Sequence, residues 1–151
     1  MKKIGIDLGG HTIAAGSVDF SGAAPQVLSA VTVPTPENRD LLSVIHALEE
    51  LILLWAAPGD ECFVGIGIPG FVDSERRRIL RLTNFVGCDG VLLGKIISAN
   101  LKARGVRVDV RLENDANCAA LGEGLAGAAR GMRDYVVLTL GTGIGAGIVA
   151  N

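Results

Sequence analysis

The segment Glu113-Asn114-Asp115-Ala116-Asn117 gathers polar side chains at one predicted junction of the chain. An alternating apolar run that ends at Leu112 predicts a strand, and the Ala-, Leu- and Glu-rich residues 116–129 predict a helix. Ligands gather where strands end in α/β sheets, so the Asp115 carboxylate is a candidate general base. Asn and Asp are also preferred helix N-caps, because their oxygens accept hydrogen bonds from the first free N–H groups. This segment alone leaves both interpretations open.

Two glycine-rich turns are the next candidates for chemistry. Gly9-Gly10 follows the predicted strand that carries Asp7, and Gly141-Thr142-Gly143 separates two predicted strands near the end of the chain. Glycine lets backbone N–H groups approach and cradle phosphate oxygens. Asp7 can hold Mg²⁺ through water, because hard oxygen ligands suit that ion. Ordinary β-hairpin turns have the same composition. The dinucleotide fingerprint is rejected for Gly141–Ala146, because the following residues continue as a strand.

The elements that must position these residues follow from hydrophobic periodicity. Alternation and β-type residues predict strands over residues 4–8, 12–18, 27–33, 62–68, 106–112, 135–140 and 144–150. Helical spacing and composition predict helices over residues 37–55, 91–104 and 116–129. A three-stranded meander followed by alternating helices and strands predicts an α/β fold with a mixed sheet. The intervening Glu75-Arg76-Arg77-Arg78 predicts a solvated charged turn.

A weak internal repeat suggests two related domains. Ile6-Asp7-Leu8-Gly9 parallels Leu138-Thr139-Leu140-Gly141, so the last two strands resemble the first two. Glycines loosen the region after Cys118. We therefore predict an N-terminal domain over residues 1–117, followed over residues 118–151 by an interdomain helix and the first hairpin of a second domain.

Composition narrows the class of function. The chain has 151 residues, of which 49% are apolar, enough for a real core. Its net charge of −2 predicts no nucleic-acid partner and no anionic membrane surface. No apolar run is long enough to span a bilayer. The three scattered cysteines, without a secretory segment before the first strand, predict reduced thiols in a cytoplasmic protein.

Five segments of the chain resemble motifs of one known protein family and occur in the same order as in that family. They are Asp7–Thr12, Ile68–Asp73, Asn84–Cys88, Glu113–Asn117 and Leu140–Gly145. In this order they resemble the motifs of the ROK family of sugar kinases, in the actin-like/hexokinase-like ATPase superfamily. The resemblance runs from Lys3 to Asn151 and covers the N-terminal half of that family. It implies an actin-like ATPase (ribonuclease H-like) domain, with the first hairpin of a second such domain.

The resemblance implies a glucokinase-like reaction in which ATP and Mg²⁺ phosphorylate a hexose, at the 6-hydroxyl. Asp115 would be the general base, and Gly70, Asn84 and Asn114 would contact the sugar. Asp7 would hold the ion through water. The residues implied to line the ATP phosphates are Gly9, Gly10, Thr12, Gly141, Thr142 and Gly143. A structural zinc is expected only in the missing C-terminal part, and the protein is expected to form a homo-oligomer.

Departures from the family motifs bear on specificity. His11 and Thr12 stand where Thr and then Lys or Asn are usual, and His11 is either a phosphate contact or a solvated turn residue. Phe85 and Cys88 replace the Leu and Trp of the sugar-loop segment. A catalytic role for Cys88 is disfavoured, since no Cys–His pairing is indicated. The sugar therefore stays open, with glucose as the default expectation.

Two other classes of function are weighed against the kinase. A sugar-responsive ROK transcriptional regulator would need a helix-turn-helix domain, for which the early first strand leaves no room, and a non-catalytic sugar-binding protein is also possible. An actin-like chaperone or polymer subunit would not predict Glu-Asn-Asp-Ala-Asn. We expect the isolated 151 residues to carry half a site with little or no activity, and to self-associate through an unpaired edge of the 135–150 hairpin.

Overall fold

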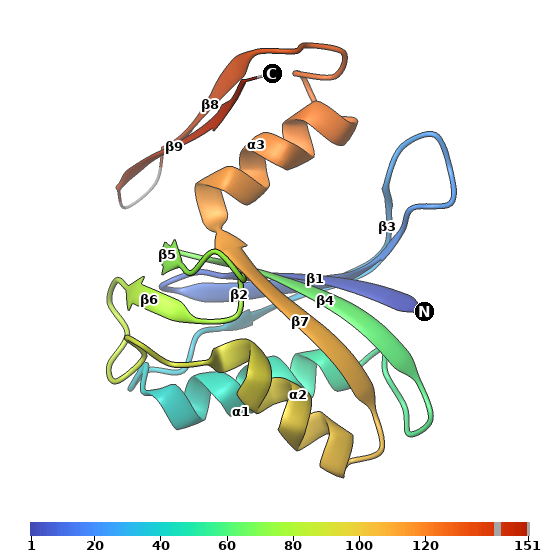
Figure 1. Cartoon of the computed structure of the whole chain (residues 1–151), viewed down its shortest axis with the longest axis vertical. Coiled ribbons are helices and arrows are strands. Elements are labelled where there is room, and N and C mark those ends of the chain that lie inside the picture. Colours follow the sequence, from blue (N-terminus) through green and yellow to red (C-terminus); the bar gives the residue numbers. More distant parts are fainter. Residues whose placement is uncertain (141–142, 151) are drawn as a thin grey trace.

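The computed structural model describes residues 1–140 and 143–150, and its centre is a five-stranded sheet with the order β3-β2-β1-β4-β7 (Figure 1). β1, β4 and β7 are parallel, whereas β2 and β3 continue the sheet as antiparallel strands. The predicted mixed α/β sheet with an opening meander is therefore confirmed. The strands of this sheet are β1 (Lys2–Leu8), β2 (Thr12–Asp19), β3 (Gln26–Pro34), β4 (Glu61–Ile68) and β7 (Arg107–Asn114).

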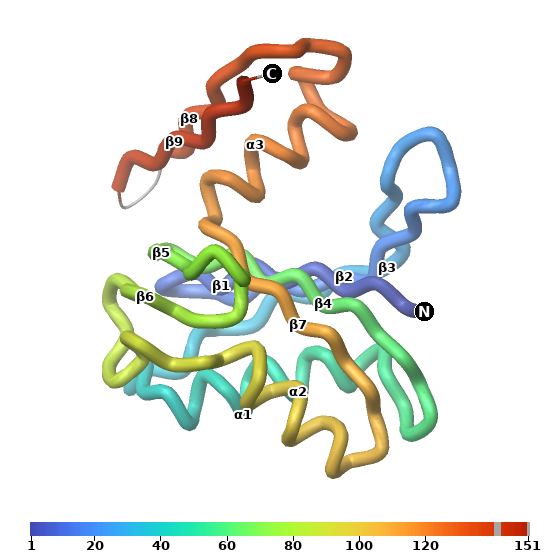
Figure 2. Tube along the Cα trace, viewed as in Figure 1, coloured from blue at the N-terminus to red at the C-terminus, as the bar shows by residue number. Residues whose placement is uncertain are grey.

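Two helices, α1 (Leu41–Leu53) and α2 (Leu93–Ala103), cover one face of this sheet, as Figures 1 and 2 show. Alternate strand residues point into the core beneath them, among them the fully buried Val64, Ile66 and Val110. Burying each such aliphatic side chain stabilises the fold by about 1.5–3 kcal/mol. On the opposite side of the sheet lies α3 (Asp115–Ala126), which contacts the sheet at its first turn (Figure 1).

The predicted helix over residues 37–55 is too long at both ends. Asp40 is the N-cap of α1, and its Oδ1 accepts the N–H of Ser43 at 2.9 Å. Arg39 has a φ of 47°, which is incompatible with a helix. Capping by Asp40 therefore decides the start, and the polar residues 37–39, which were predicted to extend the polar face of the helix, lie before it. Among the described residues, no helix combines the length and apolar character that crossing a membrane requires.

A short hairpin of β5 (Gly70–Val72) and β6 (Ile79–Leu82) was not predicted as strands. The predicted charged turn lies within it, and Glu75 and Arg76 are exposed as expected, but its contacts with β7 were not predicted. The Arg77 guanidinium lies 2.7 Å from the Asp109 carboxylate, and the carbonyl oxygen of Arg76 accepts the N–H of Leu112 at 2.8 Å. The turn thus covers the outer edge of β7, whose partners lie more than thirty residues away in sequence.

Beyond β7 the chain leaves the sheet through α3 (Asp115–Ala126) and ends in a ribbon of β8 (Tyr135–Leu140) and β9 (Ile144–Val149) (Figures 1 and 2). One face of the ribbon packs closely on α3, because a Cβ at Gly147 would collide with the carbonyl oxygen of Ala116. The turn residues Gly141 and Thr142 lie outside the described residues. The division into domains 1–117 and 118–151 stays a prediction.

The other face of the ribbon exposes large apolar side chains. The exposed fraction is 63% for Leu138 and 81% for Ile144. In the antiparallel register, Val136 lies opposite Ile148 and Leu140 opposite Ile144, so these side chains share one face. A contiguous exposed apolar surface of this kind favours association.

We expect the 151-residue chain to self-associate through this apolar face. Light scattering should then give an apparent mass that rises with concentration, and Leu138→Lys should lower it towards the monomer. Leu42→Lys is the matched control, because Leu42 is 78% exposed on α1, away from the ribbon. A monomeric mass at every concentration would contradict the expectation.

Candidate functional site

The candidate site lies where the parallel strands β1, β4 and β7 end. In their register, Asp7 pairs with Gly67, and Gly67 pairs with Glu113. Side chains paired in this way point to the same face of a sheet, so Asp7 and Glu113 flank Gly67 on the face opposite α1 and α2. The carboxyl ends of parallel strands are the usual place for ligands in such sheets.

Asp115 stands at the start of α3 without serving as its cap. The N-cap is Asn114, whose Oδ1 accepts the N–H of Asn117 at 3.1 Å. Asp115 is half-buried, and its Oδ1 accepts the N–H of Ala116 at 2.8 Å. Its Oδ2 has no hydrogen-bond partner in the described part of the chain. Asn114 therefore caps the helix, and Asp115 does not. One carboxylate oxygen of Asp115 stays available for chemistry.

Asp7 and Asp115 interact electrostatically across the strand ends. Although the Asp7 side chain reaches solvent, partial burial of its carboxylate raises its pKa, and the negative charge of Asp115 raises it further. Like charges this close favour a bound cation or proton. The described residues contain no cluster of three or more His, Cys, Asp or Glu side chains that could hold a metal ion. A cation at Asp7 would accordingly depend on water and on ligand oxygens.

The first glycine turn is held in shape by Thr35, a residue that sequence reasoning missed. Thr35 is only 7% exposed. Its hydroxyl donates to the carbonyl oxygen of Gly9 at 2.7 Å, and its N–H donates to that of His11 at 2.9 Å. A Cβ at Gly9 would lie 2.7 Å from the carbonyl oxygen of Thr12, whereas Gly10 is open. This frame leaves the residues predicted to bind phosphate, Gly9, Gly10 and Thr12, in a fixed turn.

The second glycine turn is described only in part. Gly143 is exposed next to β9, while the predicted phosphate residues Gly141 and Thr142 lie outside the described residues. The structure therefore places one of these three predicted residues.

Two of the predicted sugar-binding residues meet directly. The Nδ2 of Asn114 donates to the carbonyl oxygen of Gly70 at 3.1 Å. Gly70 also has a structural reason to be glycine, since a Cβ there would collide with the carbonyl oxygen of Arg81. Asn84 is exposed with a φ of 66°, and its neighbour Thr83 donates its N–H to the carbonyl oxygen of Pro69 at 3.2 Å. The hairpin β5–β6 thus connects all three predicted residues.

Two further residues of this site gave no signal in the sequence. A Cβ at Gly67 would lie 3.4 Å from Cys118 Sγ and 3.6 Å from Asp115 Cα, so a larger side chain would press against the first turn of α3. Although the Cys118 residue is exposed, partial burial of its thiol, and then the carboxylates of Glu113, Asp7 and Asp115, raise the pKa of that thiol to about 11. Cys88 is buried away from these carboxylates. Only the fold reveals these neighbours.

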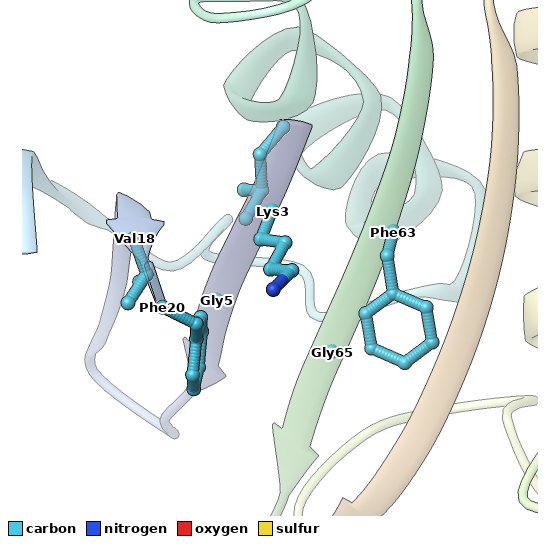
Figure 3. Close-up of a pocket in the computed structure, with 7 residues that line it drawn as sticks. Lys3, Gly5, Val18, Phe20, Phe63 and Gly65 are labelled. Carbon is cyan, nitrogen blue, oxygen red and sulfur yellow. The ribbon is translucent and has the colours of Figure 1, made fainter. Parts of the chain in front are cut away.

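One hollow on the same sheet face lies apart from the carboxylates. It measures about 360 Å³, and Figure 3 shows Gly5 and Gly65 on the strands beside it, with Phe20 and Phe63. Lys3 reaches over the Phe20 ring, with its Nζ 4.6 Å from the ring centroid. Because Gly5 and Gly65 precede Asp7 and Gly67 on their strands, this hollow does not include the strand ends.

Comparison with known proteins identifies relatives over the whole chain. The sequence model of the ROK family matches residues 3–151. The glucokinase of Thermotoga maritima is 39% identical over 151 residues, and the N-acetyl-D-glucosamine kinase of Salmonella paratyphi C is 36% identical over 152 aligned positions. These alignments cover 100% and 97% of this chain, but 45% and 46% of the relatives. The chain therefore spans about half the length of the curated relatives it matches.

A solved structure agrees with the sequence comparison. It is a ROK family glucokinase from Streptomyces griseus in complex with glucose and AMPPNP, with a TM-score of 0.81 and 33% identity. The match covers 99% of this chain and 45% of that protein. The predicted fold class, an actin-like ATPase domain with a mixed sheet, is confirmed by this likeness.

We expect Asp7→Asn to raise the melting temperature at pH 7. The folded state raises the pKa of Asp7, so folding is penalised once pH exceeds the ordinary Asp value of about 3.9. The gain should therefore shrink as pH falls towards 3. Asp60→Asn is the opposite control, because the hydrogen bond from Lys2 lowers the pKa of Asp60. Thermal unfolding at both pH values measures the effect, and a loss of stability in Asp7→Asn at pH 7 would contradict it.

We expect Cys118 to react slowly with iodoacetamide at pH 8. A thiol with a pKa of about 11 is almost entirely protonated there, and the greater nucleophilicity of its rare thiolate compensates only in part. The net rate should be about 10-fold below that of a cysteine peptide. Peptide mass spectrometry measures labelling, and Glu113→Gln should accelerate it by removing one of the charges. Labelling at the peptide's rate would refute the assigned surroundings.

Proposed function

Because this chain belongs to the ROK family, we propose that the protein transfers the γ-phosphoryl group of ATP to a hexose hydroxyl. The observation that carries the proposal is the pair of carboxylates at the strand ends, Asp7 and Asp115, which interact electrostatically. Asp115 is proposed to act on the sugar hydroxyl and Asp7 to act on the phosphates. The 151 residues supply the N-terminal half of the site.

Asp115 is the proposed general base. Its Oδ2 accepts the proton of the sugar hydroxyl as that oxygen attacks the γ-phosphorus and ADP leaves. A positioned carboxylate contributes typically 10²–10⁴-fold to such a step. Asn114 supports the geometry, because its side chain is bonded both to the N–H of Asn117 and to the carbonyl oxygen of Gly70. The remaining N–H of Asn114 and the exposed Asn84 side chain are proposed to contact sugar hydroxyls.

The glycine turns are proposed to bind the ATP phosphates. Gly10 has open space beside its Cα and Thr12 is exposed, whereas the N–H of Gly9 donates to the carbonyl oxygen of Thr12 at 3.0 Å and shapes the turn. Gly143 is proposed to contribute from the second turn. Gly141 and Thr142 complete this proposal from outside the described residues. ATP is supported by the AMPPNP in the Streptomyces griseus relative. Asp7 is proposed to hold Mg²⁺ through water, and the bound ion would neutralise the charge that builds on the phosphates.

Glucose is the proposed first substrate, with the 6-hydroxyl as acceptor. The Streptomyces griseus relative binds glucose, and the curated relatives include both glucokinases and N-acetyl-D-glucosamine kinases. A hexose therefore fits the relatives better than any smaller sugar. The reaction has ATP as a substrate and the protein has free thiols, which supports the cytoplasm as its place of action.

The larger architecture belongs to the same proposal. We place the domain boundary at residues 117–118, in the first turn of α3, so that closure of two domains brings the two glycine turns together and excludes water. A homo-oligomer and a structural zinc outside these 151 residues are proposed from the family resemblance. The isolated chain should then show little or no activity, because half of the ligand contacts are missing.

ADP release with a hexose panel tests the proposal on the longest natural form of this chain. We expect glucose-dependent release, and Asp115→Asn should lower kcat by about 10²–10⁴-fold, since a proton acceptor is lost. Asp109→Asn is the matched control, because Asp109 lies on β7, the strand that leads into α3, but pairs with Arg77.

The outcomes separate the functions that were considered. Release that survives Asp115→Asn would contradict the role of Asp115. Thermal stabilisation by sugars without any ADP release would favour a sugar-binding or regulatory protein over a kinase.

A further inference from the structure

The turn between β5 and β6 contacts β7 at three successive outward-facing positions. Arg77 pairs with Asp109 at 2.7 Å, and the Arg111 guanidinium donates to the carbonyl oxygen of Glu75 at 3.2 Å. The Arg76 Nη1 lies 3.2 Å from Glu113 Oε2. Asp73 fixes the turn itself, because its Oδ1 accepts the N–H groups of Arg77 and Arg78. Of the three positions, Glu113 is the nearest in sequence to the proposed base.

Glu113 connects this turn to the start of α3. Its Oε1 accepts the N–H of Asn114 at 2.9 Å and the Nδ2 of Asn117 at 3.0 Å. Its Oε2 is the oxygen that faces Arg76. The Glu113 side chain is only 18% exposed, so its charge is partly withdrawn from water. A partly buried charge is costly unless an opposite charge lies beside it, and the Arg76 guanidinium provides that charge for Glu113.

The charge of Arg76 also faces the acidic side of the site. The negative charges of Glu113, Asp7 and Asp115 raise the pKa of the Cys118 thiol, and the positive charge of Arg76 lowers it. Arg76 has a φ of 57°, a conformation that is uncommon for a residue with a side chain. The Leu112 N–H, which donates to its carbonyl oxygen at 2.8 Å, holds that conformation against the edge of β7.

We propose that Arg76 is a positioning residue for Asp115, acting through Glu113. The guanidinium fixes the Glu113 carboxylate, and that carboxylate holds the backbone of Asn114 and the side chain of Asn117. These two residues form the cap of α3, so the orientation of Asp115 between them depends on Arg76. The expected loss of kcat rests on the proposed function, whereas the expected effect on the start of α3 does not depend on it.

Kinetics of Arg76→Gln and Arg76→Lys, in the longest natural form of this chain, test the proposal. A misplaced catalytic group loses rate steeply, so Arg76→Gln should lower kcat about 10-fold and leave KM for ATP within about twofold. Arg76→Lys should recover part of the loss, because it keeps the charge. Arg, Gln and Lys at position 76 all bear the cost of the positive φ, so backbone strain is the same in the three proteins.

Arg77→Gln is the control variant, since it breaks an ion pair in the same turn, with Asp109 on the same strand. Each of the two pairs joins a more exposed side chain to a less exposed one, so Arg76→Gln and Arg77→Gln should change the melting temperature by similar amounts. Arg77→Gln should nevertheless keep kcat within about twofold.

A double-variant cycle shows whether Arg76 acts through Glu113. In a Glu113→Gln background, Arg76→Gln should cause no further loss of kcat. If the kcat losses of Arg76→Gln and Glu113→Gln multiply in the double variant, the proposal is overturned. A KM for ATP that rises strongly in Arg76→Gln would likewise overturn it, in favour of direct contact between Arg76 and the phosphates.

Hydrogen exchange keeps the proposal testable without activity. Exchange of the backbone amides of residues 114–117 should accelerate at least about threefold in Arg76→Gln and in Glu113→Gln, but not in Arg77→Gln. Unchanged exchange in Arg76→Gln would overturn the proposal even if the protein is a kinase. Accelerated exchange in a protein without sugar-dependent ADP release would instead overturn the proposed function alone.

Discussion

The site depends on the parallel register of β1, β4 and β7. Six residue pairs join β1 to β4 and eight join β4 to β7, and together they bring Asp7, Gly67 and Glu113 into one row. A slip of one residue would turn every side chain of a strand to the other face. The buried Ile6, Ile66 and Leu112 lie in the adjacent row beneath the helices. Burial of the core on one face therefore fixes the carboxylates on the other.

In the Glu113–Asn117 segment, neighbouring residues stabilise the helix start and provide the candidate base. Asn114 caps α3 and bonds to Gly70, while Asp115 keeps one carboxylate oxygen without a partner in the described residues. A short polar helix start can thus serve both stability and chemistry, because different side chains carry the two tasks. Gly67 contributes by letting the first turn of α3 pack closely against β4.

Much of this arrangement could be predicted from local patterns. Alternation predicted β8 over its full length and β1, β4 and β7 to within two residues, since a strand with one buried face must alternate. The start of α1 was missed because polar residues before a helix resemble its polar face, and only the Asp40 cap separates the two. Thr35, Gly67 and Cys118 gave no signal, because their partners come from other elements and meet only in the folded sheet. The contacts of Arg76 and Arg77 were missed for the same reason.

The central claim is that the Asp115 carboxylate takes part in phosphoryl transfer itself and not merely in holding the sugar. The single-turnover rate of transfer, measured by rapid quench with glucose and ATP both saturating, tests this most directly. In Asp115→Asn the account predicts a rate about 10²–10⁴-fold lower, with glucose affinity within about threefold of the unsubstituted protein. An unchanged transfer rate, with weaker glucose binding as the only effect, would contradict it.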